Sequence, residues 1–412
     1  MAVNLPPLGE LHPVPGVAIG TTFAGIKKTS AAPPPGRQDL VVMLLPEGSV
    51  AAGVFTRNAF RAAPVILAEQ AIARGGVRAL VINSGNANAA TAAPGLEDAR
   101  QVCDAAADAA GVPRGSVLPF STGVIGVRLP VDRMVEAMPA AVASARADRW
   151  ADAARAIMTT DTGPKAVSRQ VEVGGATVTV TGIAKGAGMI RPDMATMLGF
   201  VCTDAKIDGA CLAGLVRRAA DASFNRITVD GDTSTNDAFV VCATGQAEHP
   251  VVSGEQDPGY TALAEALTDV ARLLAQAIVR DGEGATRFVT VRVEGAATGA
   301  EALDVAYTIA ESPLIKTAIF AGDPNWGRFC MAIGRAGVAD LDTAGVDLFL
   351  DDVCVARGGL MADDYREEDG ARVMAQPEFT VRVVLGRGDA AETVWTTDLS
   401  YEYVKINAEY RT

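Results

Sequence analysis

The sequence KGAGMIRPDMATMLGF occupies residues 185–200, near the middle of a chain of 412 residues. The runs Ala176–Ile183 and Met197–Thr203 on either side are apolar and typical of strands, so the glycines between them lie in a long connection. On spacing alone, such glycines serve turns. Thr196 stands where this loop meets the second strand, which would expose its hydroxyl at a rigid edge. That placement suits a nucleophile that first cleaves the peptide bond before it.

Acyl transfer by such a threonine needs no histidine, and the chain has only His12 and His249. If Thr196 Oγ attacks the carbonyl carbon of Ala195, the resulting ester hydrolyses and leaves Thr196 with a free α-amine. An α-amine has an ordinary pKa of about 7.7–8.0, so it can accept the proton of its own hydroxyl group. The N-terminal threonine is a known alternative to the Ser-His-Asp triad.

Two further polar clusters fit the same chemistry. The hydroxyl of Thr122 and the N–H of Gly123, in the stretch 121–126, could form an oxyanion hole, although a turn that ends a strand is an equally natural interpretation. The hydroxyls of residues 159–162 close a helix, where such groups commonly bond to the backbone. We interpret 83–88 as a structured polar turn and 224–233 as a polar shell that supports the site.

Composition excludes several other classes of function. With 49% apolar and 21% charged residues the chain is a folded protein, and its net charge of −13 argues against a general binder of nucleic-acid phosphates. No phosphate-binding, dinucleotide, zinc-protease or hydrolase motif occurs, and the six cysteines form no CxxC pair. We therefore expect no metal and no cofactor. No signal peptide or membrane-spanning run is evident, which predicts a cytoplasmic protein.

The pattern of elements predicts an α+β layered fold. Short β-rich runs alternate with Ala-rich helical runs, but without the regular rhythm of a doubly wound sheet. A hairpin is expected around Gly174-Gly175, and helices at Leu96–Ala110, Val131–Ala145 and about Tyr260–Val279. The length alone would suggest two or three structural units.

Six strings together resemble the ornithine acetyltransferase family, also called glutamate N-acetyltransferase. They are KGAGMIRPDMATML, STGVIG, IMTTDTGPK, FNRITVDGDTSTND, GDPNWGR and the closing YVKINAEYRT. The resemblance runs from about residue 17 to the end of the chain. It implies a layered fold like that of the β-aminopeptidases, with two intertwined chains.

The resemblance also implies a reaction, in which acetyl moves from N2-acetyl-L-ornithine to L-glutamate in arginine biosynthesis. Self-cleavage between Ala195 and Thr196 would give an α chain (1–195) and a β chain (196–412), which are not independent domains and assemble as two of each. Thr196 would carry the acetyl group, with Thr122 and Gly123 as the oxyanion hole. The positions that match substrate contacts are Thr159, Lys185, Thr196, Glu283, Asn407 and Thr412.

Several alternatives stay open at this level. Lys185 and Asn407 are donors that could meet the α-carboxylate shared by both substrates. Glu283 could meet the ornithine ammonium, orient the Thr196 amine, or be a solvated loop acid. Whether acetyl-CoA is also a donor is undecided. The same nucleophile would serve an amidohydrolase or aminopeptidase, and an Ala/Gly-rich assembly or binding protein would need none of this chemistry.

Overall fold

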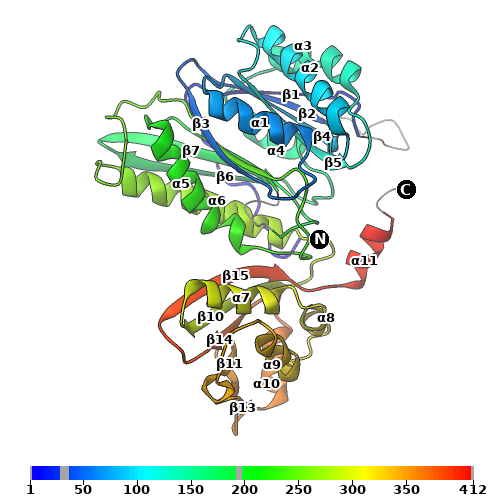
Figure 1. The fold of residues 1–412 in the computed structure, drawn as a ribbon, viewed down its shortest axis with the longest axis vertical. Coiled ribbons are helices and arrows are strands. Elements are labelled where there is room, and N and C mark those ends of the chain that lie inside the picture. The colour runs from blue at the N-terminus through cyan, green and yellow to red at the C-terminus, as the bar shows by residue number, and fades with distance from the viewer. Residues whose placement is uncertain (1, 28–36, 192–196, 410–412) are drawn as a thin grey trace.

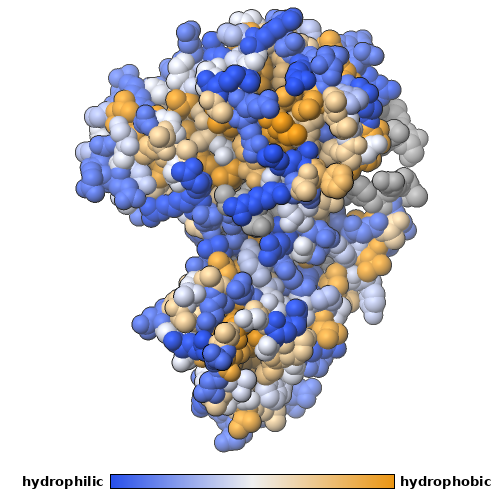
Figure 2. Space-filling view, viewed as in Figure 1, coloured by the Kyte–Doolittle hydropathy of each residue, from blue (hydrophilic) through white to orange (hydrophobic). Residues whose placement is uncertain are grey.

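The computed structural model describes residues 2–27, 37–191 and 197–409. Across these residues the strands form three sheets, two in one lobe and the third in a second lobe (Figure 1). The molecule narrows at a waist between the lobes, and its surface mixes hydrophilic and hydrophobic residues (Figure 2). The predicted layered mixture of helices and sheets is confirmed. None of the helices in the described ranges is long and apolar enough to cross a membrane.

The first sheet has the order β1-β2-β4-β5. Its strands are β1 (Ala18–Thr22), β2 (Leu40–Leu44), β4 (Ala79–Asn86) and β5 (Val117–Val124). Its helices are α1 (Ala63–Arg74), α2 (Ala92–Ala110), α3 (Val131–Ala143) and α4 (Trp150–Ala156). Apolar residues of α2 and α3 pack on one face, while the other face shares a core with α1, α4 and the second sheet.

The second sheet has the order β3-β9-β8-β7-β6. Its strands are β3 (Val50–Phe55), β6 (Lys165–Val173), β7 (Ala176–Lys185), β8 (Leu198–Thr203) and β9 (Ala238–Ala243). Its outer face is covered by α5 (Gly209–Asp221), the 3-10 turn η1 (Phe224–Arg226) and α6 (Tyr260–Arg280). The two sheets thus pack face to face, with the rings of Phe120 and Phe200 only 4.8 Å apart between centroids.

The second sheet contains strands from both sides of residues 192–196. β8 lies between β7, which precedes that segment, and β9, which follows it, and β9 pairs in turn with the early strand β3. The predicted hairpin of β6 and β7 is confirmed. Because each half contributes strands that hydrogen-bond to the other, neither half contains the whole of this second sheet.

The third sheet has the order β13-β12-β11-β14-β10-β15 and its own core. Its strands are β10 (Phe288–Ala296), β11 (Asp347–Leu350), β12 (Val353–Arg357), β13 (Leu360–Met361), β14 (Glu378–Val384) and β15 (Ala390–Thr397). Beside it lie α7 (Gly299–Ala310), α8 (Pro313–Ala321), α9 (Trp326–Gly334), η2 (Thr343–Gly345) and α10 (Glu367–Met374). The last helix, α11 (Tyr401–Ala408), returns from β15 towards the first lobe (Figure 1).

The structure corrects two local expectations. Residues 83–86 and 121–124 belong to strands, not to turns, because β4 and β5 pair in parallel register as far as Gly85 and Gly123. The helix between these two strands completes a βαβ unit, and β8, α5 and β9 form another. The βαβ units are therefore present. The sequence shows no regular βαβ alternation because long segments separate these units.

Candidate active site

Six of the predicted site residues line one cavity of about 250 Å³, although they come from distant parts of the chain. They are Thr122, Gly123, Thr159, Lys185, Glu283 and Asn407. Met197 and Leu198 also line it, so the described chain resumes at the cavity wall directly after residues 192–196. The predicted nucleophile Thr196, its neighbour Ala195, and Thr412 lie outside the described residues.

Thr122 and Gly123 lie at the end of β5. Gly123 has φ +133°, and a Cβ there would be 2.3 Å from the backbone carbon of Gly85, so this close approach of two strands requires glycine. Thr122 Oγ1 accepts a hydrogen bond of 3.3 Å from Lys185 Nζ. Its own hydroxyl hydrogen therefore points elsewhere and can donate to a developing oxyanion.

Lys185 is the last residue of β7, and its side chain is buried. Burial lowers the pKa of this ammonium, and the Asp161 carboxylate is the strongest group that opposes the decrease. Its hydrogen bond to Thr122 leaves further N–H donors on Nζ. Lys185 can therefore bind a substrate carboxylate at the cavity wall.

Glu283 and Asn407 form a second side of the cavity. Asn407 Nδ2 donates to Glu283 Oε2 at 2.8 Å and to the backbone oxygen of Tyr403 at 3.0 Å. Both hydrogens of this amide are thus engaged, so Lys185, and not Asn407, offers free donors to a carboxylate. A Cβ at Gly188 would lie 2.4 Å from the Glu283 carboxylate, so glycine there leaves the space that this carboxylate fills.

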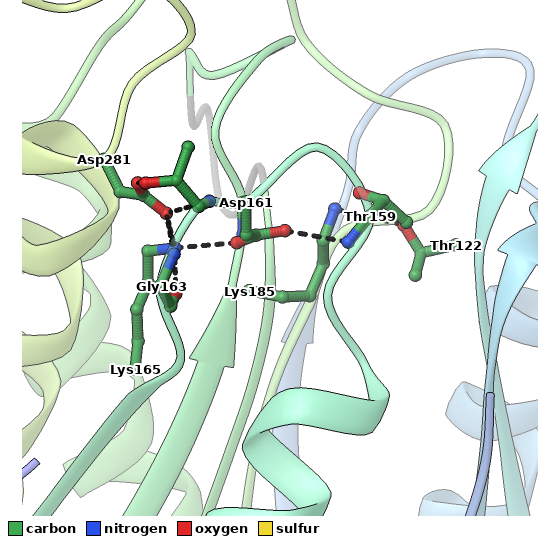
Figure 3. A network of polar contacts seen from close by, with 9 residues as sticks. Thr122, Thr159, Asp161, Gly163, Lys165, Lys185 and Asp281 are labelled. Atoms are coloured by element: carbon green, nitrogen blue, oxygen red, sulfur yellow. Dashed lines mark hydrogen bonds and ion pairs between the residues drawn. The ribbon is translucent and has the colours of Figure 1, made fainter. Parts of the chain in front are cut away.

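The turn that carries Thr159 is held by buried charged groups that the sequence analysis did not identify (Figure 3). Asp161 Oδ2 accepts from the Thr159 N–H at 2.9 Å, and Lys165 Nζ reaches Asp161 at 2.7 Å and Asp281 at 2.6 Å. The Thr162 hydroxyl donates to the Asp281 carboxylate and not to the backbone. The spacing of four residues between Asp161 and Lys165 could have indicated an ion pair from the sequence alone. The contact with Asp281 could not be predicted in this way, because Asp281 lies more than a hundred residues further along the chain.

The polar loop 224–233 and the residues that follow support the chain on both sides of 192–196. Asp230 accepts from the N–H groups of Met189 and Ile190 at 2.6 and 2.8 Å, which holds Met189 at φ +56°. On the other side, the Ala238 N–H donates to the Met197 carbonyl at 2.8 Å. This agrees with the interpretation of the loop as a supporting shell.

Asp237 is a further cavity residue that the sequence analysis missed. It is 3% exposed, and its Oδ2 has no hydrogen-bond partner among the residues that the structure describes. Burial raises its pKa well above the ordinary value for a carboxyl. The position of an acidic residue directly before the apolar strand β9 could have indicated a buried carboxyl group from the sequence. The cavity wall thus includes a buried carboxyl oxygen that no described residue hydrogen-bonds.

Comparison with known proteins identifies the family of the chain. The model of the ArgJ family matches residues 18–412. The arginine biosynthesis bifunctional protein ArgJ of Pseudomonas syringae pv. tomato is 58% identical, and that of Pseudomonas fluorescens 55%, each over the whole of both chains.

Solved structures include the argJ protein of Bacillus halodurans, with 39% identity over 51% of this chain and 97% of that chain, and a TM-score of 0.49. Ornithine acetyltransferase of Mycobacterium tuberculosis, complexed with ornithine, is 35% identical over 44% of this chain and 94% of that chain, with a TM-score of 0.37. From the extent of the family match and the identity to its members, the chain belongs to the ArgJ family.

Proposed function

We propose that this protein is the glutamate N-acetyltransferase of arginine biosynthesis, which moves acetyl from N2-acetyl-L-ornithine to L-glutamate. The observation that carries the proposal is the convergence of six predicted site residues on one cavity, in a chain of the ArgJ family. Relatives that match the whole chain are named for arginine biosynthesis.

The reaction proceeds through an ester on Thr196. Thr196 Oγ attacks the acetyl carbonyl carbon of acetylornithine while the Thr196 α-amine accepts the hydroxyl proton. The acetyl C–N bond breaks, and the α-amine returns the proton to the departing ornithine nitrogen. The glutamate amine then attacks the ester, which restores the Thr196 hydroxyl and releases acetylglutamate.

Described residues supply the charge stabilisation and the binding of both substrates. The Thr122 hydroxyl and the Gly123 N–H donate to the oxyanion of each tetrahedral intermediate. The Lys185 ammonium binds the α-carboxylate that both amino acids share. Glu283 faces the ornithine ammonium or the Thr196 amine, and Thr159, Asn407 and Thr412 complete the substrate contacts.

Self-cleavage between Ala195 and Thr196 creates the nucleophile. It divides the protein into an α chain of residues 1–195 and a β chain of residues 196–412, which assemble as two of each in the cytoplasm. Hydrogen bonds at Met189, Ile190 and Met197, together with the shared second sheet, support this proposal, because they anchor the described chain on both sides of residues 192–196.

Acetyl-CoA is the second donor that we propose, since the relatives are called bifunctional. It would acetylate the same Thr196 by loss of the CoA thiol. A comparison of the initial rates with acetyl-CoA and with acetylornithine, each with glutamate as acceptor, tests this part by itself.

Denaturing electrophoresis and product analysis test the main proposal. Scaling the mass of 42.4 kDa by length gives expected fragments of about 20 and about 22 kDa. Acetylornithine should yield acetylglutamate when glutamate is present. An intact chain without acetyl transfer would refute the proposal, and release of free acetate regardless of glutamate would identify an amidohydrolase instead.

A further inference from the structure

Two aspartates and a lysine form a buried charged cluster behind the cavity: Asp161, Lys165 and Asp281. The Lys165 ammonium lies 2.7 Å from Asp161 Oδ1 and 2.6 Å from Asp281 Oδ2, and none of the three side chains is exposed to solvent. Burial of three ions costs several kcal/mol for each, and apolar residues would serve packing at least as well. The cluster therefore calls for a role beyond stability.

The cluster contacts segments that carry three residues of the cavity wall, and Figure 3 shows its contact with Thr159. Asp161 accepts hydrogen bonds from the backbone N–H groups of Thr159, at 2.9 Å, and of Gly186, at 2.7 Å. Asp281 accepts from the N–H of Thr162 at 2.9 Å and lies two residues before Glu283. Movement of the cluster would therefore displace Thr159, Lys185 and Glu283 together.

The cluster also carries a net negative charge beside Lys185. When all three groups are ionised, two carboxylates face one ammonium. Burial by itself raises the pKa of Asp161, but Lys165, Lys185 and the Gly186 N–H outweigh it, so that its pKa lies well below the ordinary value. Asp161 is thus a full carboxylate at neutral pH.

We propose that Asp161, held in place by Lys165 and Asp281, is a positioning residue that fixes the backbone at Thr159 and Gly186 and holds a carboxylate on the side of the buried Lys185 ammonium. This inference rests on the proposed function, in which Lys185 binds the substrate α-carboxylate. The charged groups that act on Lys185 come from several elements: Asp161, Lys165, Asp237 and Glu283, with Lys27 on the side of β1. Among them Asp161 makes the largest contribution that favours the charged lysine.

The two aspartates of the cluster provide a matched pair of variants. Asp161→Asn and Asp281→Asn each remove one carboxylate from Lys165, so a purely structural role predicts similar losses. Asp281 is not among the charged groups that act most strongly on Lys185. We expect Asp161→Asn to move the alkaline limb of kcat/KM for glutamate down by about one pH unit, through a rise in KM. Asp281→Asn should leave that limb in place, even if kcat falls.

A double variant covers the case in which Asp161→Asn does not fold. The double variant Lys165→Gln, Asp281→Asn removes one charge of each sign but keeps Asp161 beside Lys185. The alkaline limb of its kcat/KM profile should therefore lie at the wild-type pH or above it. A downward shift in the double variant, or equal limbs in the two single variants, would overturn the inference. Failure of the proposed function is distinct, because the wild-type protein would then transfer no acetyl group at any pH.

Discussion

Replacement of Gly188 by alanine should displace the Glu283 carboxylate and leave the fold intact. The new Cβ would lie 2.4 Å from Glu283 Cδ and Oε2, whereas ordinary van der Waals contact begins at 3.4 Å, so the carboxylate must withdraw by about 1 Å. Gly188 is not among the residues with positive φ, so alanine adds no backbone strain. A displacement of about 1 Å in a catalytic group costs about 100-fold in rate.

Steady-state transfer of acetyl from acetylornithine to glutamate measures the effect. The processed fraction is determined on a denaturing gel for each variant, so that slow self-cleavage is not mistaken for slow transfer. Gly214→Ala is the matched control, because Gly214 lies in α5 and, beyond the helix's own backbone, its ideal Cβ meets no atom of the described residues within 4 Å. That variant should keep wild-type activity and gain about 0.5–1 kcal/mol of stability.

A double-mutant cycle tests whether the loss acts through Glu283. In the Glu283→Ala background the carboxylate is gone, so Gly188→Ala should cause little additional loss. If the two losses multiply instead, the alanine acts elsewhere and the steric reasoning is wrong. Unchanged activity in the single variant would refute it equally.

Three further outcomes follow from individual contacts. Asp230→Ala removes the acceptor for the N–H groups of Met189 and Ile190, so self-cleavage should slow, which the intact fraction on a denaturing gel over time will reveal. Thr122→Val should lower kcat by about 10²–10³-fold whereas Thr122→Ser keeps most of it, as expected for an oxyanion donor, and stopped-time assays of acetylglutamate will check this. Burial lowers the pKa of Lys316 to about 8, so the unfolded chain binds more protons than the folded one between about pH 8 and 10.5, and Lys316 makes stability rise with pH there. Lys316→Met should remove this rise, at most about 1.4 kcal/mol per pH unit, in denaturant titrations across that range.

Local chemistry made part of the site predictable from the sequence. The Gly174-Gly175 pair between two strand-like runs specifies the hairpin of β6 and β7, because glycine readily adopts the positive φ that a two-residue hairpin turn requires. Short motifs marked Thr122, Gly123, Thr159 and Lys185, and these residues line one cavity. The shortage of histidine led to an N-terminal threonine as the proposed nucleophile and base.

Strand boundaries near the site could not be predicted in the same way. STGVIG has the composition of a turn, yet its first four residues continue β5 because β4 supplies partners for their backbone groups. The same parallel partner requires a glycine at position 123. Neighbouring strands that are distant in sequence thus override local propensity.

The amino-acid sequence by itself determined which residue types are available for acyl transfer, since nucleophile, donors and acids are local properties of short motifs. Only the tertiary structure decided which charged and polar partners these groups have and where in the cavity they lie. Lys165 is paired with Asp281 across 116 residues, and Asn407 with Glu283 across 124. The hydrophobic periodicity of the sequence does not predict such pairs. A buried ion is stabilised by whichever partner the fold brings within hydrogen-bond distance.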